Sequence, residues 1–197
     1  WWPERRATYR EAAYDFPLHL EKAPEELWAI FLPRLAMSVA VFVNGNFIGD
    51  GGRLERPLSR NANRPLLFNI PTGMLRAGEN SVRVRLVVGR TFPGILDPPY
   101  IGPQKVLQLW FDARHAFQVI VPQGVAVASI AVALLILGVF VRRDTEGANA
   151  WFAAALILWA VALIQGVLRD APLPARQWEF VGVASHAAVV YRPIRAF

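Results

Sequence analysis

The strongest constraint on the fold is an uncharged stretch from Val119 to Val141, in which only Gln123 and Ser129 have polar side chains. As an α-helix at about 1.5 Å per residue, this stretch is roughly 34 Å long, and the hydrocarbon core of a bilayer is roughly 30 Å thick. Arg142 and Arg143 follow it at once. The sequence therefore predicts a membrane-spanning helix over residues 119–141.

Two further apolar runs follow this stretch. The first covers residues 150–168, contains Gln165 as its one polar side chain, and begins after a short polar link at residues 144–149. Because the link is so short, we expect the two helices to form a hairpin. The last run is too short to cross a bilayer and predicts an incomplete third helix over residues 178–191.

Charged residues are concentrated before these runs. The chain has 21 Lys and Arg and 15 Asp and Glu, of which 15 and 11 precede residue 116. We therefore expect a water-exposed domain at 1–115 and a membrane region at 116–197. The basic residues are spread along the chain, which argues against nucleic acid as a partner. The absence of cysteine excludes disulfides and thiolate metal ligands.

Alternation of apolar and polar residues in the first domain predicts β-strands, because a period of two buries one face of a strand. Three segments show this pattern: Tyr14–Glu21, Val82–Leu86 and Leu107–Asp112.

A turn signal lies between two apolar segments, 38–43 and 46–49. Asn44 and Gly45 separate these segments, and both residue types accept the positive φ that a tight hairpin turn requires. A further apolar segment at 66–70 predicts another strand. Together, the segments predict an all-β sandwich of seven or more strands.

One series of segments also carries a family resemblance. The sequence VFVNGNFIG at 41–49 is followed by Phe68-Asn69-Ile70-Pro71 and then by LRAGENSVRV at 75–84. This series resembles the galactose-binding-like jelly roll found beside many glycoside hydrolases. A jelly roll followed directly by hydrophobic helices is similar to bacterial seven-transmembrane receptors with diverse intracellular signalling modules, and to the sensor regions of membrane histidine kinases. The resemblance implies an all-β jelly-roll sandwich followed by α-helical transmembrane segments.

By the same resemblance, the chain is expected to be the sensory and transmembrane part of a multi-pass signal-transduction receptor in the bacterial cytoplasmic membrane. Residues 1–115 would lie outside and Arg142-Arg143 inside, with a small-molecule or carbohydrate ligand and a homodimeric assembly. The chain ends soon after an apolar run, so we expect a longer parent protein whose output module is a histidine kinase or, as the next choice, a diguanylate cyclase. The alternative is a carbohydrate-binding accessory domain of a membrane-anchored glycoside hydrolase.

A polar loop at residues 50–64 is the candidate binding site. Its four arginines and two asparagines can present donors to a carboxylate, a phosphate or sugar hydroxyls, although a solvated loop explains the same composition. The candidate ligand-binding residues are Arg53, Arg56, Arg60, Asn61, Asn63 and Arg64.

No catalytic, cofactor or metal motif is present in the sequence. The three histidines, His19, His115 and His186, stand apart, and we expect structural roles for them. The segment 90–103 is rich in proline and glycine and predicts a rigid loop across one end of the sandwich, with transmission of movement to the helices as a hypothesis. Gln165 and His186 lie in apolar runs and predict bonds between helices, with a signalling seam as the alternative.

Overall fold

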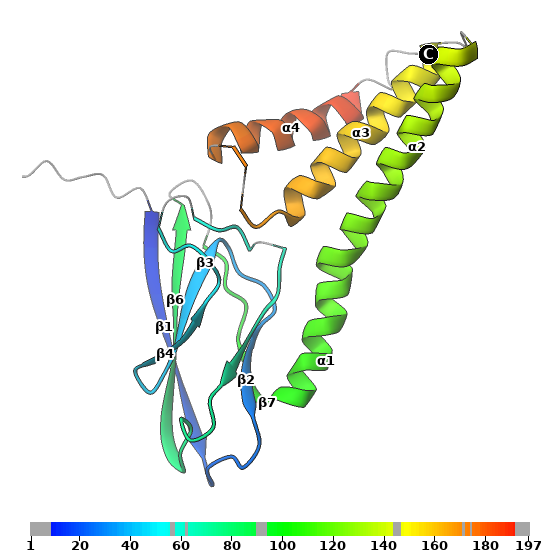
Figure 1. Ribbon diagram of the computed structural model, residues 1–197. Coiled ribbons are helices and arrows are strands. Elements are labelled where there is room, and N and C mark those ends of the chain that lie inside the picture. Colours follow the sequence, from blue (N-terminus) through cyan, green and yellow to red (C-terminus); the bar gives the residue numbers. More distant parts are fainter. Residues whose placement is uncertain are drawn as a thin grey trace, which may run out of the picture. The chain divides into compact units, whose positions relative to one another are not determined.

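The computed structural model describes residues 9–55, 58–61, 63–89, 94–143, 147–170, 172–173 and 175–191. The chain divides into two compact units, Trp1–Ala116 and Phe117–Phe197. The first unit consists of antiparallel sheets and one helix, and the second consists of helices (Figure 1).

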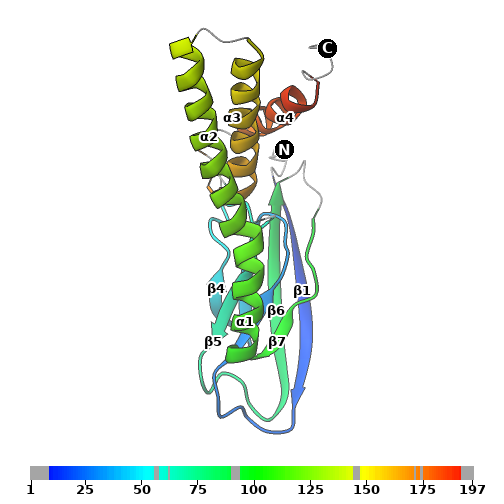
Figure 2. The same cartoon turned by 90° about the vertical axis from the view of Figure 1, so that its right-hand side faces the viewer.

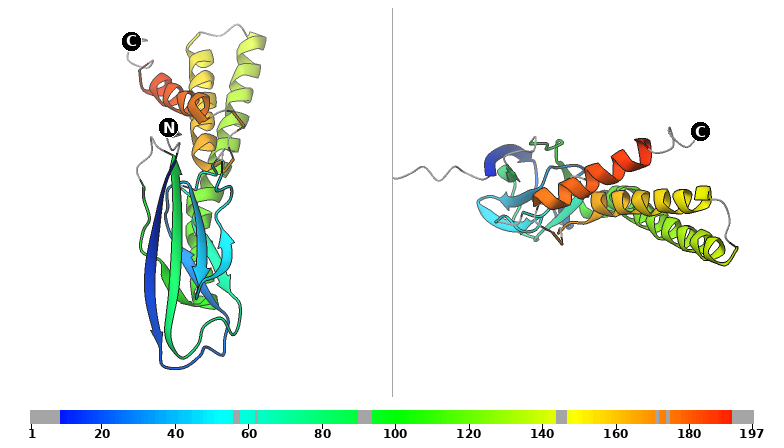
Figure 3. Two further views of the ribbon diagram at one scale, coloured as in Figure 1. Left: turned by 90° about the vertical axis from the view of Figure 1, so that its left-hand side faces the viewer. Right: turned by 90° about the horizontal axis from the view of Figure 1, so that it is seen from above.

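Two antiparallel sheets form the first unit. The four-stranded sheet has the order β1-β6-β3-β4, and the three-stranded sheet has the order β5-β2-β7. The long strands β1 and β6 lie side by side along their whole length (Figure 3). In chain order the strands are β1 (Tyr9–Leu20), β2 (Trp28–Leu32), β3 (Ser38–Val43), β4 (Asn46–Asp50), β5 (Leu66–Ile70), β6 (Gly78–Gly89) and β7 (Tyr100–Pro103).

Side chains from both sheets share one hydrophobic core. On β6, Val82, Val84 and Leu86 are buried in it, whereas Arg83 and Arg85 between them face the other way. The strand predicted from this alternation is therefore confirmed, and so is the strand at the start of the domain, which lies in β1. The predicted strand at 66–70 is also confirmed, because it is β5.

The turn between β3 and β4 has the predicted geometry. Asn44 and Gly45 have φ angles of 49° and 81°, in the left-handed region that favours these residue types. The Asn44 amide Nδ2 also donates to the carbonyl of Met74 and to Oδ1 of Asn80. The hairpin is thus tied to the chain segment that leads into β6, and its prediction is confirmed.

The strand predicted at Leu107–Asp112 is wrong, because this segment lies in helix α1 (Gln104–His115). Leu107 and Phe111 are four residues apart, so one helix face presents both to β2. Leu109 lies between them in sequence and is 69% exposed. The apparent period of two arose because both faces of this helix carry apolar residues.

Helix α1 covers the three-stranded sheet on the side away from the core (Figure 2). Strand β2 is consequently buried on both faces: Ile30 and Leu32 belong to the core, and Ala29 and Phe31 contact the helix side. The first unit is therefore a mixed structure of antiparallel sheets and a helix rather than an all-β domain.

The chain remains helical from Gln104 to Arg143. A π-helical segment, η1 (Ala116–Ile120), follows α1 directly and leads into α2 (Val121–Arg143). Helices α3 (Gly147–Val167) and α4 (Ala175–Tyr191) complete the second unit, in which α3 packs against both α2 and α4. Two helical stretches, Gln104–Val141 and Asn149–Val167, are long and apolar enough to cross a membrane.

Helices α3 and α4 are joined by the polar side chain predicted to do so. Gln165 Nε2 donates to the Trp178 carbonyl oxygen at 3.0 Å, which confirms a bond between helices for this residue. His186 instead contacts the Gly182 carbonyl of its own helix, with Nδ1 at 2.8 Å, so the interhelical bond predicted for it is wrong.

Gly182→Val is expected to weaken the contact between α3 and α4. A Cβ atom at this position would overlap the Gln165 side chain, which would have to move and lose its bond to Trp178. We expect a loss of about 1 kcal/mol, the scale of a polar bond between membrane helices. Unfolding of the helices by sodium dodecyl sulfate in mixed micelles, followed by far-UV circular dichroism, measures this loss of stability. Gly138→Val is the matched control, because nothing lies within 4 Å of a Cβ there, and an equal loss in both variants would contradict the explanation.

Candidate functional site

The predicted arginine loop does not present its candidate residues as one set. Arg53 and Asn63 are exposed, Arg60 and Arg64 are half-buried, and Asn61 is fully buried. Arg56 lies outside the described residues. A shallow cavity lies on the outer face of the four-stranded sheet, and none of the described loop residues lines it.

Asn61 is an anchor for this loop. Its Nδ2 atom donates to the carbonyls of Met37 and Gly51, each at 2.7 Å, and its backbone N–H donates to the Met37 carbonyl at 3.2 Å. Both amide hydrogens are therefore used to hold the loop against the start of β3 and the end of β4. This arrangement assigns Asn61 to the structure of the loop.

The second predicted loop lies partly outside the described residues, since 90–93 are not described. Its remainder packs along residues 34–36: the backbone N–H of Ala36 donates to Ile95, and that of Asp97 donates to Arg34. The segment then enters β7 and α1. It thus connects the sheets directly to the helix.

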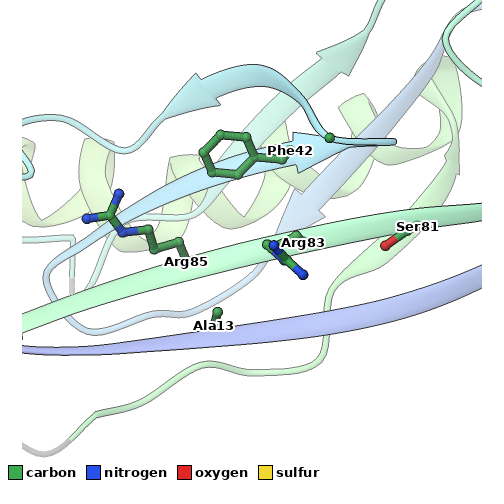
Figure 4. Close-up of a pocket in the computed structure, with 6 residues that line it drawn as sticks. Ala13, Phe42, Ser81, Arg83 and Arg85 are labelled. Atoms are coloured by element: carbon green, nitrogen blue, oxygen red, sulfur yellow. The ribbon is translucent and has the colours of Figure 1, made fainter.

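A shallow cavity of about 420 Å³ lies on the face of the four-stranded sheet opposite the core. Figure 4 shows side chains on β1, β3 and β6 that line it. The lining residues are Ala13, Phe42, Gly45, Ser81, Arg83 and Arg85.

Cross-strand register builds one row of this site. Asp15 on β1 lies opposite Arg83 on β6, Arg83 lies opposite Phe42 on β3, and Phe42 lies opposite Phe47 on β4. Residues directly opposite each other in antiparallel strands project from the same face. An acidic, a basic and two aromatic side chains therefore cross all four strands in a line.

Both cavity arginines are paired with carboxylates. Arg83 donates from Nε and Nη2 to the two oxygens of Asp15, at 2.6 and 3.0 Å. Arg85 makes the same forked contact with Glu11, at 3.1 and 3.0 Å. These bidentate pairs hold each guanidinium in a fixed plane along the sheet.

The two phenylalanines form the aromatic part of the site. The rings of Phe42 and Phe47 meet edge to face, with centroids 5.6 Å apart. Phe47 is 55% exposed, and Phe42 is half-buried beside the arginines. An edge-to-face contact is a favoured ring geometry, so Phe47 supports the Phe42 ring in place.

The lining of the cavity offers guanidinium and aromatic groups that can contact a ligand. The histidines of the first unit lie elsewhere: His19 pairs with Glu79 at 2.8 Å, and His115 stacks on Phe111. Among the residues that the structure describes, no group of three or more His, Cys, Asp or Glu is placed to hold a metal ion.

The pair between Asp15 and Arg83 is expected to lose its contribution to stability in acid. Hydrogen bonds from Arg83 are the main cause that holds the pKa of the Asp15 carboxyl below its ordinary value of 3.8; desolvation opposes them, and the Arg83 charge adds a smaller lowering effect. A carboxyl whose pKa is lowered on folding contributes fully above that ordinary value, and the contribution disappears as pH falls through the folded-state pKa. The melting temperatures of the chain and of Asp15→Asn, measured from about pH 6 to about pH 2, should therefore converge below about pH 4. A difference that stays constant across this range would contradict the prediction.

Sequence reasoning missed this site, although part of its signal was present. The alternation that predicted β6 places Arg83 and Arg85 on the solvent face, and the one that predicted β1 places Asp15 there. What was missing was the register that brings residues 68 positions apart into contact.

Comparison with known proteins adds no family to these observations. No protein-family model matches the chain, and no curated protein matches it.

Proposed function

We propose that this chain is the sensory and membrane part of a bacterial signal-transduction receptor. In this proposal the first unit is a galactose-binding-like jelly roll outside the cytoplasmic membrane, and the helices relay its state to a cytoplasmic output module. A histidine kinase is the first choice for that module, and a diguanylate cyclase is the second.

The observation that carries the proposal is the unbroken helix from Gln104 to Arg143. Its first part, α1, buries Leu107 against the three-stranded sheet of the first unit, and its last part is long and apolar enough to cross a membrane. No loop intervenes at the boundary between the units, after Ala116, where the chain is π-helical. A domain that is merely anchored to the membrane needs no continuous helix, whereas a receptor that passes movement through the membrane does.

The mechanism that fits this continuity is a shift of population. A ligand that binds one arrangement of the sheets and α1 more tightly than another will favour that arrangement by its difference in affinity. Because α1 continues into α2, each arrangement of α1 is passed on as a displacement of the helix that follows. The accessory-domain alternative requires only one anchoring helix, and two helices here satisfy the length and apolarity that spanning requires.

Sequencing the parent gene beyond the codon for Phe197 tests the receptor assignment. We expect further hydrophobic helices, followed either by a histidine-containing dimerisation helix with an ATP-binding domain or by a cyclase domain. A glycosidase domain, or a stop codon with no output domain, would contradict the assignment.

Cysteine labelling tests the orientation, because the chain contains no cysteine of its own. Glu21→Cys lies at an exposed position of the first unit, and Glu146→Cys comes three residues after the end of α2 in the sequence. A membrane-impermeant maleimide applied to intact spheroplasts should label the Glu21→Cys variant. It should leave the Glu146→Cys variant unlabelled until the spheroplasts are lysed. The reverse pattern would contradict the proposed topology.

A further inference from the structure

We infer that the π-helical segment η1 is a rotary switch within the long helix. Its residues, Ala116–Ile120, alternate between the π-helical turn of the structure and an ordinary α-helical turn. Each change rotates α2 about its own axis relative to α1. This inference rests on the proposed function only in treating that rotation as the signal that reaches the cytoplasm.

The sequence explains why η1 is not α-helical. Pro122 lies in the first turn of α2, two residues after the end of η1. Proline has no backbone N–H, and its ring clashes with the carbonyl four positions earlier in an α-helix, which here belongs to Gln118. A π-helical turn is wider, because its hydrogen bonds join residues five apart instead of four. Pro122 therefore disfavours the α-helical form of this segment.

The side chain of Gln118 disfavours the π-helical form. Its Oε1 atom is buried and, among the residues that the structure describes, has no hydrogen-bond partner. A buried carbonyl oxygen without a partner is unfavourable, because it has given up its hydrogen bonds to water. A rotation that returns this oxygen to water or to a donor removes that cost. Pro122 and Gln118 thus act in opposite directions, as a segment with two accessible forms requires.

The helices on both sides of η1 are held by their own neighbours. On α1, Leu107 is buried with residues of β2, and Phe111 packs on the same cluster. On α2, which packs against α3, Ala126 and Ala133 lie seven residues apart and are fully buried. These contacts hold each helix within its own unit. A change of turn in η1 therefore rotates α2 relative to α1, because no loose end is present to absorb it.

Helix geometry gives the size of this rotation. An α-helix has 3.6 residues per turn, so each residue accounts for about 100°. A single π-helical turn holds about one residue more than an α-helical turn. Conversion of η1 to an α-helical turn should therefore rotate α2 by about 100° relative to α1.

Double electron–electron resonance between two spin labels tests the inference, on residues 1–197 in nanodiscs that hold one chain each. The chain has no cysteine, so labels attach only where one is introduced. Ala113→Cys and Val127→Cys are exposed positions on either side of η1, two heptads apart. Residues at this spacing lie on nearly the same face of a regular α-helix. The α-helical form should therefore give a distance shorter by roughly 4 Å than the π-helical form. We expect a major long distance and a minor short one.

Two variants should shift these populations in opposite directions. Pro122→Ala removes the ring and restores the N–H, so the short distance should become the major one. Gln118→Leu replaces the buried amide with an apolar side chain, so the short distance should disappear. Val121→Ala, which keeps the proline, is the matched control and should leave both populations unchanged. Labels at Val127→Cys and Val141→Cys, also two heptads apart but both within α2, should give the same distance in every variant.

Three results would overturn the inference: a long distance alone in the unsubstituted background, populations that Pro122→Ala leaves unchanged, or a short population that Gln118→Leu does not remove. None of these results bears on the parent gene. Failure here therefore removes the switch, whereas the receptor assignment stands or falls on the output domain.

Discussion

Leu107→Ala should destabilise the first unit by about 2–5 kcal/mol, the usual cost of removing a buried leucine side chain. Leu107 is 4% exposed and packs with Ala29 and Phe31 of β2, on the sheet face away from the core. The smaller side chain leaves a cavity beneath α1 that the sheet cannot close. Urea unfolding of the chain in mild detergent, followed by far-UV circular dichroism of the sheets, measures the change.

Leu109→Ala is the matched control for this prediction. The residue type is the same, but Leu109 is 69% exposed, so its loss should change stability by no more than about 0.5 kcal/mol. A strand at 107–112 would place both leucines on one face and would give equal losses. Equal losses would therefore contradict the helix, and a large difference supports it.

The sheets were predictable wherever one strand face is buried and the other is in water. Val82 and Val84 face the core while Arg83 and Arg85 face solvent, and the sequence shows this contrast as an alternation of valine and arginine. The turn at Asn44 was predictable for a different reason, because few residue types accept its positive φ.

Helix α1 was missed because both of its sides are apolar. Leu107 contacts the sheet, whereas Val106, Leu109 and Trp110 are exposed by 48–69%. Five apolar residues among the six from 106 to 111 carry no clear period. A better signal was in β2, where Trp28–Leu32 is apolar throughout. A strand buried on both faces requires a second covering layer, and α1 is that layer.

The candidate site was missed because it depends on register between distant strands. Composition drew attention to the arginine loop, where six polar residues are close in sequence. The candidate site instead places Arg83 of the cavity beside Phe42 and pairs it with Asp15, which are 41 and 68 positions away. Local patterns predict which face a residue occupies, whereas the neighbouring strand that supplies its partner is fixed only by the folded topology.

Asn80→Ala should cost about 3 kcal/mol, because this side chain satisfies several polar groups at once. Asn80 is 4% exposed. Its Oδ1 accepts from the backbone N–H of Arg76 and from the Asn44 amide, and its Nδ2 donates to the carbonyls of Arg76 and Gly78. This network accounts for Asn80, because the asparagine side chain closes the turn into β6 and holds the β3–β4 hairpin.

Asn46→Ala provides the comparison, because Asn46 is exposed and its amide makes one long contact, 3.4 Å, to the Asn44 carbonyl. We expect its loss to change stability by less than about 0.5 kcal/mol. Asn80→Asp should fall between the two, since it keeps the acceptor but loses both donated bonds. The same urea titration ranks the three variants. If Asn80→Ala proved as mild as Asn46→Ala, water would be satisfying the backbone of this turn and the side-chain network would not be what holds the hairpin to β6.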